Sequence, residues 1–378
     1  MTAIFIATKD NISIYIHWPF CKAKCPYCDF NSHVSEKINH EIWRESYIKA
    51  ISYYTDVLAS RKVQSIYFGG GTPSLMRPST IKSILETLNS ISTFSTNIEI
   101  TMEANPTSIE IDKLKHFKDA GVNRISIGIQ SLQDHHLQFL GREHSTCDAI
   151  NALEAAQKIF SRHTFDLIYA LPNQSMKEWE ADLRTAMELA GGHISLYQLT
   201  IEKGTPFFMR HKRGEFELPS QDDAASMYEL TSRVVGEYGY NAYEVSNYAK
   251  AGEESRHNLA YWRYQDYLGI GPGAHGRLTK DGIKHATQDY YNPDLWLEHV
   301  ANHGHGCQVL DPLDEDSISK ERLIMGLRLE EGVDLLWVNP EKAKVLYENG
   351  LAVNSGGRFI LTKSGMLVLN SVLEYLQD

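Results

Sequence analysis

The sequence predicts an α/β fold that is built on a parallel sheet and followed by a smaller α+β module. From about residue 12 to about residue 245, strand-like and helix-like segments alternate, with about 30 residues for each pair. This spacing is typical of right-handed βαβ units, in which the strands run parallel. Six such units can form a partial barrel or an open doubly wound sheet, and periodicity alone does not choose between the two.

The strand-like segments are short, nearly apolar throughout and rich in Ile, Tyr, Val and Phe. This composition is typical of strands that are covered on both faces of a sheet. The six segments lie at residues 12–18, 63–70, 97–103, 124–131, 164–171 and 193–200.

Helical segments stand between these strands. Examples lie at residues 79–91, 109–121 and 176–192. In the second segment Ile111, Leu114 and Phe117 recur at three-residue steps, which favours one buried helical face. Gly121 then predicts the end of that helix.

The alternation stops at about residue 250. Residues 251–306 include the aromatic and glycine-rich stretch RHNLAYWRYQDYLGIGPGAHG, and we expect them to form a connecting region. The predicted domains are therefore a barrel at residues 1–250, this connection, and a third unit at residues 307–378.

The third unit is predicted to resemble a winged helix. Residues 317–338 and 343–352 have helical patterns. Residues 354–376 then contain a glycine turn, a short strand and a final amphipathic helix. Many winged helices bind DNA, but the basic recognition face is missing here, so we do not expect a nucleic-acid partner.

Charge and composition support that exclusion. The formal net charge is −11 and the pI is about 5.8, whereas a general nucleic-acid binder carries a basic patch or stripe. The basic stretch at residues 207–216 is interpreted as a solvated loop.

The sequence favours a cytoplasmic protein without an integral membrane segment. Its first ten residues lack the basic start of a signal peptide, and no run reaches the roughly 18 apolar residues of a spanning helix. The 5 cysteines are an odd number in a long chain, which argues against a disulfide framework. Reduced thiols in a cluster then point to a metal.

Cys21, Cys25 and Cys28 form such a cluster, with the spacing C-x3-C-x2-C, on the loop after the first strand. Thiolates bind iron–sulfur clusters and zinc. A structural zinc site needs four ligands, and the fourth would be His33. A cubane held by three cysteines instead leaves one iron open to a small molecule. Three buried thiols without metal remain a further alternative.

With the aromatic Tyr27 just before its last cysteine, this motif resembles that of the radical S-adenosylmethionine (SAM) superfamily. In that family three irons of a [4Fe–4S] cluster take cysteine, and the amine and carboxylate of SAM chelate the fourth. The resemblance therefore implies a [4Fe–4S] cluster on the three cysteines, SAM as a cofactor, and a partial (β/α)6 radical SAM barrel.

In a barrel of this kind, ligands gather at the carboxyl ends of the strands. Glycines allow close approach of the backbone, arginine suits a carboxylate, and acidic residues suit ribose hydroxyls or an amine. Salt-bridge and capping roles are the alternative for each residue taken singly. The candidates at strand ends are Gly70, Gly71, Thr72, Glu103, Gln130, Arg142 and Asp166. Resemblance to the coproporphyrinogen dehydrogenase branch implies that these residues, together with Tyr15 and Tyr27, contact SAM.

Two kinds of protein share this branch. The decarboxylating enzyme carries a further cysteine two residues after the third, where this chain has Phe30, and a longer segment before the first strand. The chain instead resembles the HemW-type haem chaperones in CPYCDFNSH at residues 25–33 and in HNLAYW at residues 257–262. The resemblance implies a carrier that binds haem and transfers it to acceptor apoproteins.

Haem requires an axial ligand and an apolar, aromatic slot. His257 offers an imidazole, and Tyr261 shares its face if this stretch is helical. The alternative is that His257 only makes a hydrogen bond within a packed aromatic layer. The alternative function is an oxygen-independent coproporphyrinogen-III dehydrogenase, so enzymatic use of the scaffold stays open. An electron donor and the haem acceptors are expected partners whose identities the sequence does not contain.

Overall fold

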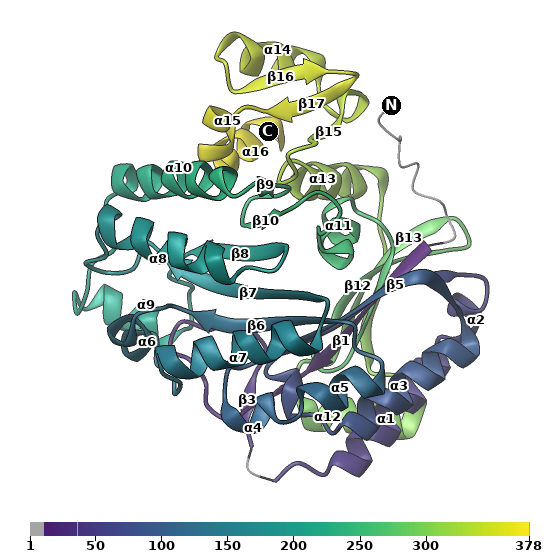
Figure 1. Ribbon diagram of the computed structural model, residues 1–378. Coiled ribbons are helices and arrows are strands. Elements are labelled where there is room, and N and C mark those ends of the chain that lie inside the picture. Colours follow the sequence, from purple (N-terminus) through teal and green to yellow (C-terminus); the bar gives the residue numbers. More distant parts are fainter. Residues whose placement is uncertain (1–10, 36, 378) are drawn as a thin grey trace.

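One twelve-stranded sheet organises most of the protein (Figure 1). The computed structural model describes residues 11–35 and 37–377. The first ten residues, on which the expectation about a signal peptide rests, lie outside the described part. Six parallel strands follow one another across the sheet in chain order: β1 (Asn11–Trp18), β4 (Lys62–Gly70), β5 (Thr93–Ala104), β6 (Arg124–Gln130), β7 (Arg162–Tyr169) and β8 (His193–Gln198).

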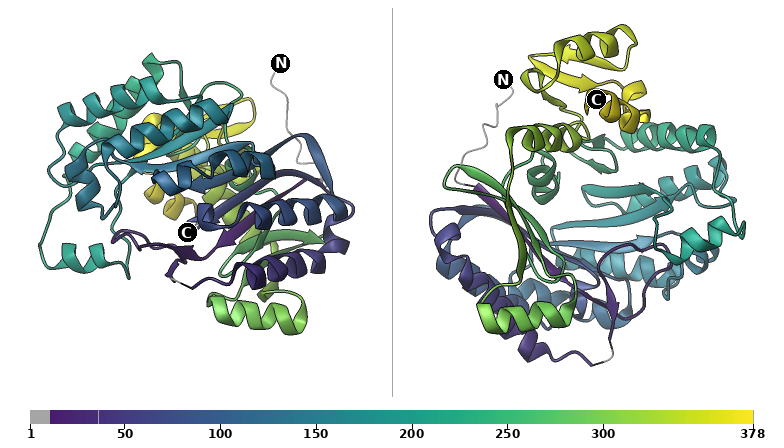
Figure 2. Two further views of the ribbon diagram at one scale, coloured as in Figure 1. Left: turned by 60° about the horizontal axis from the view of Figure 1, so that its bottom comes forward. Right: turned by 180° about the vertical axis from the view of Figure 1, so that it is seen from behind.

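This strand order decides between the two predicted architectures. A doubly wound sheet reverses its strand order at a switch point, whereas these strands keep one direction of winding throughout. The sheet curves, and the crossover helices cover its outer side, as the two further views show (Figure 2). The predicted partial barrel is therefore confirmed. These helices are α1 (His40–Tyr53), α2 (Thr55–Leu58), α3 (Pro78–Ile91), α4 (Ser108–Ile111), α5 (Leu114–Ala120), α6 (Asp134–Phe139), α7 (Thr146–Ile159) and α8 (Met176–Leu189).

The helix expected at residues 109–121 is divided into α4 and α5. Its predicted end is correct, because Gly121 adopts a positive φ of 117° and its N–H caps α5. The two-residue break between the helices, at residues 112–113, leaves no mark in the periodicity of the apolar residues.

The strands are not apolar on both faces, contrary to the expectation. In β1, Ile12, Ile14 and Ile16 are fully buried in the main hydrophobic core, while the alternate residues are polar or aromatic. The neighbouring strand repeats this alternation, because Ser13 pairs with Ser65 in the register and Tyr15 pairs with Tyr67. The inner face of the sheet is thereby supplied with groups that can bind a polar ligand.

Residues 251–306 do more than connect two domains. After α11 (Arg256–Trp262), β11 (Tyr267–Ile270) pairs in parallel with β1, on the side away from β4. Three antiparallel strands continue the sheet, and α12 (Pro293–His303) packs its Trp296 on Trp43 of α1, with ring centroids 5.5 Å apart. The added strands are β12 (His275–Lys280), β13 (Ile283–Asp289) and β14 (Cys307–Pro312).

At the other edge of the sheet, β10 (Asn247–Ala249) pairs antiparallel with β8, and β9 (Asn241–Ala242) pairs antiparallel with β10. They follow α10 (Gln221–Glu237). The basic stretch at residues 207–216 begins with α9 (Pro206–Lys212) rather than forming a loop throughout. The guanidinium of Arg210 lies 5.3 Å from the ring centroid of Phe207, which fixes one basic side chain of the stretch.

A second hydrophobic core begins at Leu323, which is later in the chain than the expected boundary because β14 still belongs to the main sheet. Residues 317–338 are helical only in their first part, since the chain turns at Gly332 with a positive φ of 62°. The glycine turn, strand and final helix are confirmed. The elements of this module are α13 (Glu315–Gly326), β15 (Val333–Asp334), the 3-10 turn η2 (Leu335–Trp337), α14 (Pro340–Glu348), β16 (Ala352–Ser355), β17 (Arg358–Leu361), α15 (Lys363–Leu367) and α16 (Leu369–Gln377).

None of the helices that the structure describes combines the length and apolar character that are needed to traverse a lipid bilayer.

Candidate metal centre and ligand cavity

The three clustered cysteines lie on a loop whose two ends are held together. The short strands β2 (Phe20–Cys21) and β3 (His33–Val34) pair at its base, and the His33 N–H donates to the Pro19 carbonyl across 2.7 Å. Farther along, His17 Nε2 donates to the Asn31 carbonyl at 2.8 Å. The loop is therefore fixed at the carboxyl end of β1, where ligands of such barrels gather.

All 5 cysteines of the chain are free, and the three in the loop are half-buried. Thr72 Oγ1 donates to Cys21 Sγ, and Arg142 Nη1 donates to Cys25 Sγ, both across 3.4 Å. Burial raises the pKa of the Cys21 thiol, which opposes its ionisation. Donors aimed at sulfur favour the thiolate, and a bound metal would supply the remaining positive charge. The donor set fits a metal–thiolate centre.

The spacing of the sulfurs bears on the zinc alternative. Four ligands around one zinc place neighbouring sulfurs about 3.8 Å apart, given zinc–sulfur bonds of about 2.3 Å. Within the described part of the chain, the cysteine sulfurs and His33 do not form a group of ligand atoms within 4.8 Å of one another. His33 Nε2 is also occupied, since it lies 2.8 Å from Asn31 Oδ1. The arrangement suits a multi-iron cluster better than a single ion.

The glycines at the end of β4 pack closely against the cysteine loop. Gly70 has a positive φ of 110°, and a Cβ on Gly71 would lie 2.7 Å from the Phe20 carbonyl oxygen. The Gly71 N–H donates to the Trp18 carbonyl, and the Thr72 N–H donates to the Phe20 carbonyl. Only residues without a side chain allow β4 to approach the cysteine loop this closely.

A hydrogen-bonded chain links two of the sulfurs through Asn105, which the sequence analysis did not identify. Arg142 Nη2 donates to Asn105 Oδ1 at 2.6 Å, and Asn105 Nδ2 donates to Thr72 Oγ1 at 3.2 Å. Asn105 directly follows β5, so its position at a strand end is the signal that could have revealed it.

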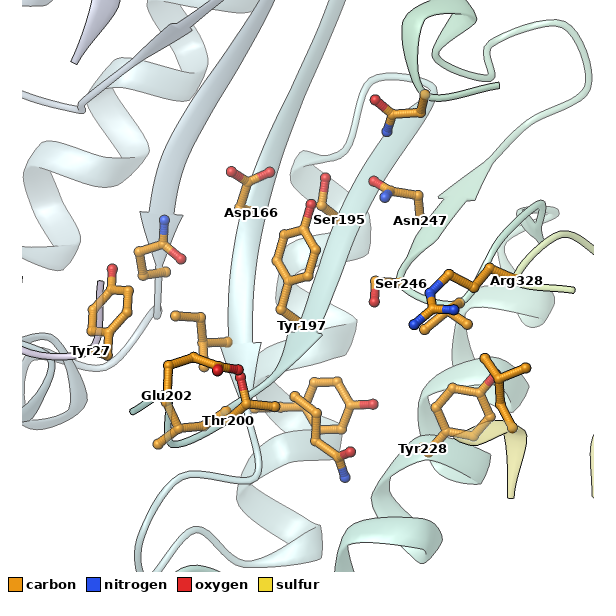
Figure 3. Close-up of a pocket in the computed structure, with 18 of the residues that line it drawn as sticks. Tyr27, Asp166, Ser195, Tyr197, Thr200, Glu202, Tyr228, Ser246, Asn247 and Arg328 are labelled. Carbon is orange, nitrogen blue, oxygen red and sulfur yellow. The ribbon is translucent and has the colours of Figure 1, made fainter. Parts of the chain in front are cut away.

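A cavity of about 990 Å³ extends from the cysteine loop along the inner face of the sheet to the C-terminal module. This volume lies at the upper end of the usual range of roughly 300–1,000 Å³ for ligand pockets. Figure 3 shows Tyr27 and Arg328 on opposite sides of the cavity, with Asp166, Ser195 and Tyr197 between them. Five of the predicted contacts or metal ligands line it: Tyr27, Cys28, Glu103, Gln130 and Asp166.

Glu103 and Asp166, which line this cavity, carry carboxyl groups with shifted pKa values. Burial raises the pKa of Glu103 to about 7, although the Tyr67 hydroxyl donates to it across 2.8 Å. Burial also raises the pKa of Asp166 to about 6, opposed by a hydrogen bond from Ser195. Both groups can accept hydrogen bonds from a polar ligand, and both change their charge close to neutral pH.

The other predicted contacts lie around the cavity. Tyr15, on the inner face of β1, is not among the residues that line it, and its hydroxyl lies 3.0 Å from His17 Nδ1. Gln130 ends β6 with a positive φ of 73°, which turns the chain away from the sheet. Four predicted contacts lie against the cysteine loop and are not part of the cavity wall: Gly70, Gly71, Thr72 and Arg142.

His257 and Tyr261 lie on α11, which packs against β4 on the same inner face. The ring of His257 stacks on Tyr67 with centroids 5.0 Å apart, and its Nδ1 lies 3.2 Å from Ser65 Oγ. This is the packed aromatic layer that the alternative interpretation describes. Burial lowers the pKa of His257 to about 4, so the imidazole is neutral at pH 7. Tyr261 is partly exposed, with a fractional exposure of 36%.

Two cavity-lining arginines escaped the sequence analysis. Arg124 is buried, with one terminal nitrogen lacking a hydrogen-bond partner, and it follows the same alternation as Ser126 along β6. That alternation is the only feature of the sequence that could have indicated that Arg124 faces the cavity. Arg328 comes from the C-terminal module, and nothing local in the sequence shows that it faces the barrel.

Comparison with known proteins gives consistent results. A family model described as "Radical SAM superfamily" matches residues 15–186. The chain is 44% identical to the "Heme chaperone HemW" of Haemophilus influenzae, with 96% of this chain and 97% of that protein covered. It is 41% identical to the "Heme chaperone HemW" of Escherichia coli, with 96% and 97% covered.

Similarity extends to animals and to a solved structure. The zebrafish "Radical S-adenosyl methionine domain-containing protein 1, mitochondrial" is 38% identical, with 96% of this chain and 86% of that protein covered. The solved coproporphyrinogen III oxidase (HemN) of Escherichia coli, described as a radical SAM enzyme, superposes with a TM-score of 0.81. It shares 21% identity, with 98% of this chain and 91% of that chain covered, so the likeness concerns the fold.

Proposed function

Because this chain belongs to the HemW-type family of the radical SAM superfamily, we propose that it binds haem and transfers it to acceptor apoproteins. It would carry a [4Fe–4S] cluster on Cys21, Cys25 and Cys28, with SAM at the fourth iron. The observation that carries the proposal is the cavity of about 990 Å³ that joins the cysteine loop to the C-terminal module.

The cysteine loop supports the cluster and its ligand. When bound, the cluster supplies an electron-transfer centre with one iron open to an external ligand. Thr72 and Arg142 donate to two of the sulfurs, which stabilises their negative charge. Glu103 and Asp166 are proposed to accept hydrogen bonds from the ribose or amine of SAM, and Tyr27 and Gln130 to pack beside it.

The cavity wall supports a large, flat and partly acidic cargo. Tyr67, Tyr197 and Tyr228 provide aromatic surface, and Arg124 and Arg328 provide positive charge for carboxylates such as the propionates of haem. Arg328 belongs to the C-terminal module, so movement of that module would change the affinity of the cavity for haem. A carrier requires such a change in order to release what it binds.

We propose His257 as the axial ligand and Tyr261 as its neighbour on α11. The Ser65 hydroxyl donates to Ser13 at 2.8 Å, so Ser65 is free to accept the proton on His257 Nδ1. That tautomer leaves the lone pair on Nε2, the usual arrangement of a histidine ligand.

An oxygen-independent coproporphyrinogen-III dehydrogenase is the second candidate, favoured by the fold alone. The position of the enzyme's further cysteine is occupied by Phe30, which is 58% exposed at the cavity rim. An exposed phenylalanine is suited to contact with a macrocycle or a partner protein. The proposed location is the cytoplasm, with an unidentified electron donor as a further partner.

Anaerobic incubation of the reconstituted protein separates the two functions. Cluster content, haem binding and the products from coproporphyrinogen with SAM are measured on the same preparation. Stable haem uptake without decarboxylation, followed by transfer to an apoprotein, is the expected result. Formation of protoporphyrinogen over many turnovers would refute the carrier function, and lack of any haem uptake would do so as well.

A further inference from the structure

A second group of metal-ligating side chains lies outside the cavity, where α6 meets the first turn of α8. The Nε2 atoms of His135 and His136 each lie 3.4 Å from Glu178 Oε1. The three ligand atoms fall within 4.8 Å of one another, and no other group of three in the described residues does so. Both helices lie on the same side of the barrel in Figure 1.

The two imidazoles approach the same carboxylate oxygen. Their ring centroids are 4.0 Å apart, and both nitrogens are directed to Glu178. A simple ion pair would need only one ring at this oxygen. Two nitrogens and one oxygen that converge on a point are instead the arrangement by which a protein holds a metal cation.

His136 provides an independent sign that a ligand is missing. Its fractional exposure is 3%, and its buried Nε2 makes no hydrogen bond of good geometry, although Glu178 Oε1 lies 3.4 Å away. A buried polar atom without a partner costs of the order of 1–3 kcal/mol, so such atoms are rare in folded proteins. A metal bound at Nε2 would remove this cost.

The surroundings hold the three side chains in place. The Glu178 N–H donates to Ser175 Oγ at 3.1 Å, which caps α8 and fixes its first turn. One turn later, Asp182 Oδ1 accepts a hydrogen bond of 2.6 Å from Gln133 Nε2, at the start of α6. The two helices are thus joined beside the site before any ion binds.

We propose that His135, His136 and Glu178 bind one divalent ion of the zinc class, with water in the remaining position. Imidazole nitrogen and carboxylate oxygen are ordinary ligands for this class, at distances of about 2.0–2.2 Å. The ion would tie α6 to α8. Because α6 lies between Gln130 and Arg142, it would also stabilise the connection that carries these two residues. The site is independent of the proposed function.

Zinc binding to the protein with its cluster tests this site, since loaded cysteines no longer compete for the ion. Equilibrium dialysis against zinc chloride under anaerobic conditions, followed by metal analysis, should find about one tightly bound zinc in the wild type. His136→Ala should weaken this binding at least about tenfold, and Glu178→Gln should do the same. Zinc should also raise the thermal stability of the wild type but not of either variant.

Two histidine variants serve as controls. His116→Ala removes an exposed imidazole on α5 and should leave zinc binding unchanged. His299→Ala disturbs a different group of histidines, in which the rings of His299 and His303 lie 4.3 Å apart. The proposal is refuted if His299→Ala abolishes binding, or if His136→Ala and Glu178→Gln both bind zinc as the wild type does. His135→Ala, at an exposed position, repeats the test if His136→Ala does not fold.

Discussion

The guanidinium of Arg142 donates to the Sγ atom of Cys25 across 3.4 Å, although 117 residues separate the two in the chain. The same guanidinium donates to the Gly128 carbonyl at 2.8 Å and to Asn105 at 2.6 Å. One side chain therefore joins the cysteine loop to the ends of two strands. Its five donors in a rigid plane allow this, whereas a lysine ammonium has one centre.

Arg142→Lys should weaken retention of the cluster without unfolding the barrel. Lysine keeps the charge but cannot reach a sulfur, a carbonyl and an amide together, so the half-time of cluster loss in air should shorten severalfold. Iron and sulfide content over time measure this. Lys22→Ala, which removes an exposed ion pair with Glu143 beside the same loop, is the control and should lose its cluster at the wild-type rate. Equal rates for all three proteins would contradict a role for Arg142 at the sulfur.

Glu103→Gln should change how stability depends on pH. The pKa of Glu103 in the folded protein is about 7, above the ordinary value of 4.5 for a glutamate, so the folded state binds the proton more tightly. The contribution of Glu103 to the free energy of unfolding is therefore greatest below about pH 4.5, and it is lost as the pH rises to about 7. At pH 8 the variant, free of ligands, should be more stable by about 1–2 kcal/mol, allowing for water in the cavity.

Urea unfolding of the ligand-free protein at pH 5 and pH 8 measures this difference. Glu154→Gln, at an exposed position on α7, should show the same pH dependence as the wild type. A gap between Glu103→Gln and wild type that stays constant across this range would show that Glu103 is not protonated in the fold.

His257→Ala should weaken haem binding at least about tenfold, because an axial ligand is lost, while iron and sulfide content stay at the wild-type level. Absorption spectra of the haem complex and a haem titration provide the measurement. His285→Ala, on β13, removes a half-buried imidazole far along the sheet from α11 and serves as the control. A haem spectrum identical to that of the wild type would move the axial ligand to another residue.

Trp296→Ala should destabilise the whole barrel. Trp296 is fully buried on Trp43, and its Nε1 donates to Asp289 at 2.8 Å, so the substitution leaves a void and removes one of the two hydrogen bonds that Asp289 Oδ2 accepts, the other coming from the Gly271 N–H. We expect a loss of about 3–5 kcal/mol in the free energy of unfolding. Chemical denaturation should show this loss as an earlier unfolding transition of the barrel, to which α1 belongs. Trp337→Ala, on the C-terminal module, is the control and should leave that transition in place.

The sequence was sufficient to predict the six barrel strands, because each pairs with the next one along the chain and each is long enough to show its pattern. It was insufficient for β11, which has only 4 residues and pairs with β1 across more than half of the chain. Local composition around Tyr267 carries no trace of this distant partner. The sequence analysis therefore did not identify the strands that residues 251–306 add to the main sheet.

The residues of the candidate site also fall into those that the sequence could predict and those that it could not. Glu103, Asp166 and the cysteines follow from their places at strand ends and in a known spacing, whereas Arg328 enters the cavity only through docking of the C-terminal module. The helical spacing of His257 and Tyr261 indicated a shared face of α11. It did not show that Ser65 and Tyr67 would cover the imidazole, because that depends on how the helix meets the sheet.

Asn31, at the end of the cysteine loop, donates from Nδ2 to the carbonyls of Pro272 and Tyr291 at 2.8 and 2.9 Å. The loop that is proposed to hold the cluster is thus supported by residues outside the stretch 15–186 that the radical SAM family model matches. A chain cut at residue 250 would lose this support and would also leave the hydrogen-bonding edge of β1 bare. Bare edges recruit other strands, so the shortened protein should aggregate rather than serve as a minimal barrel.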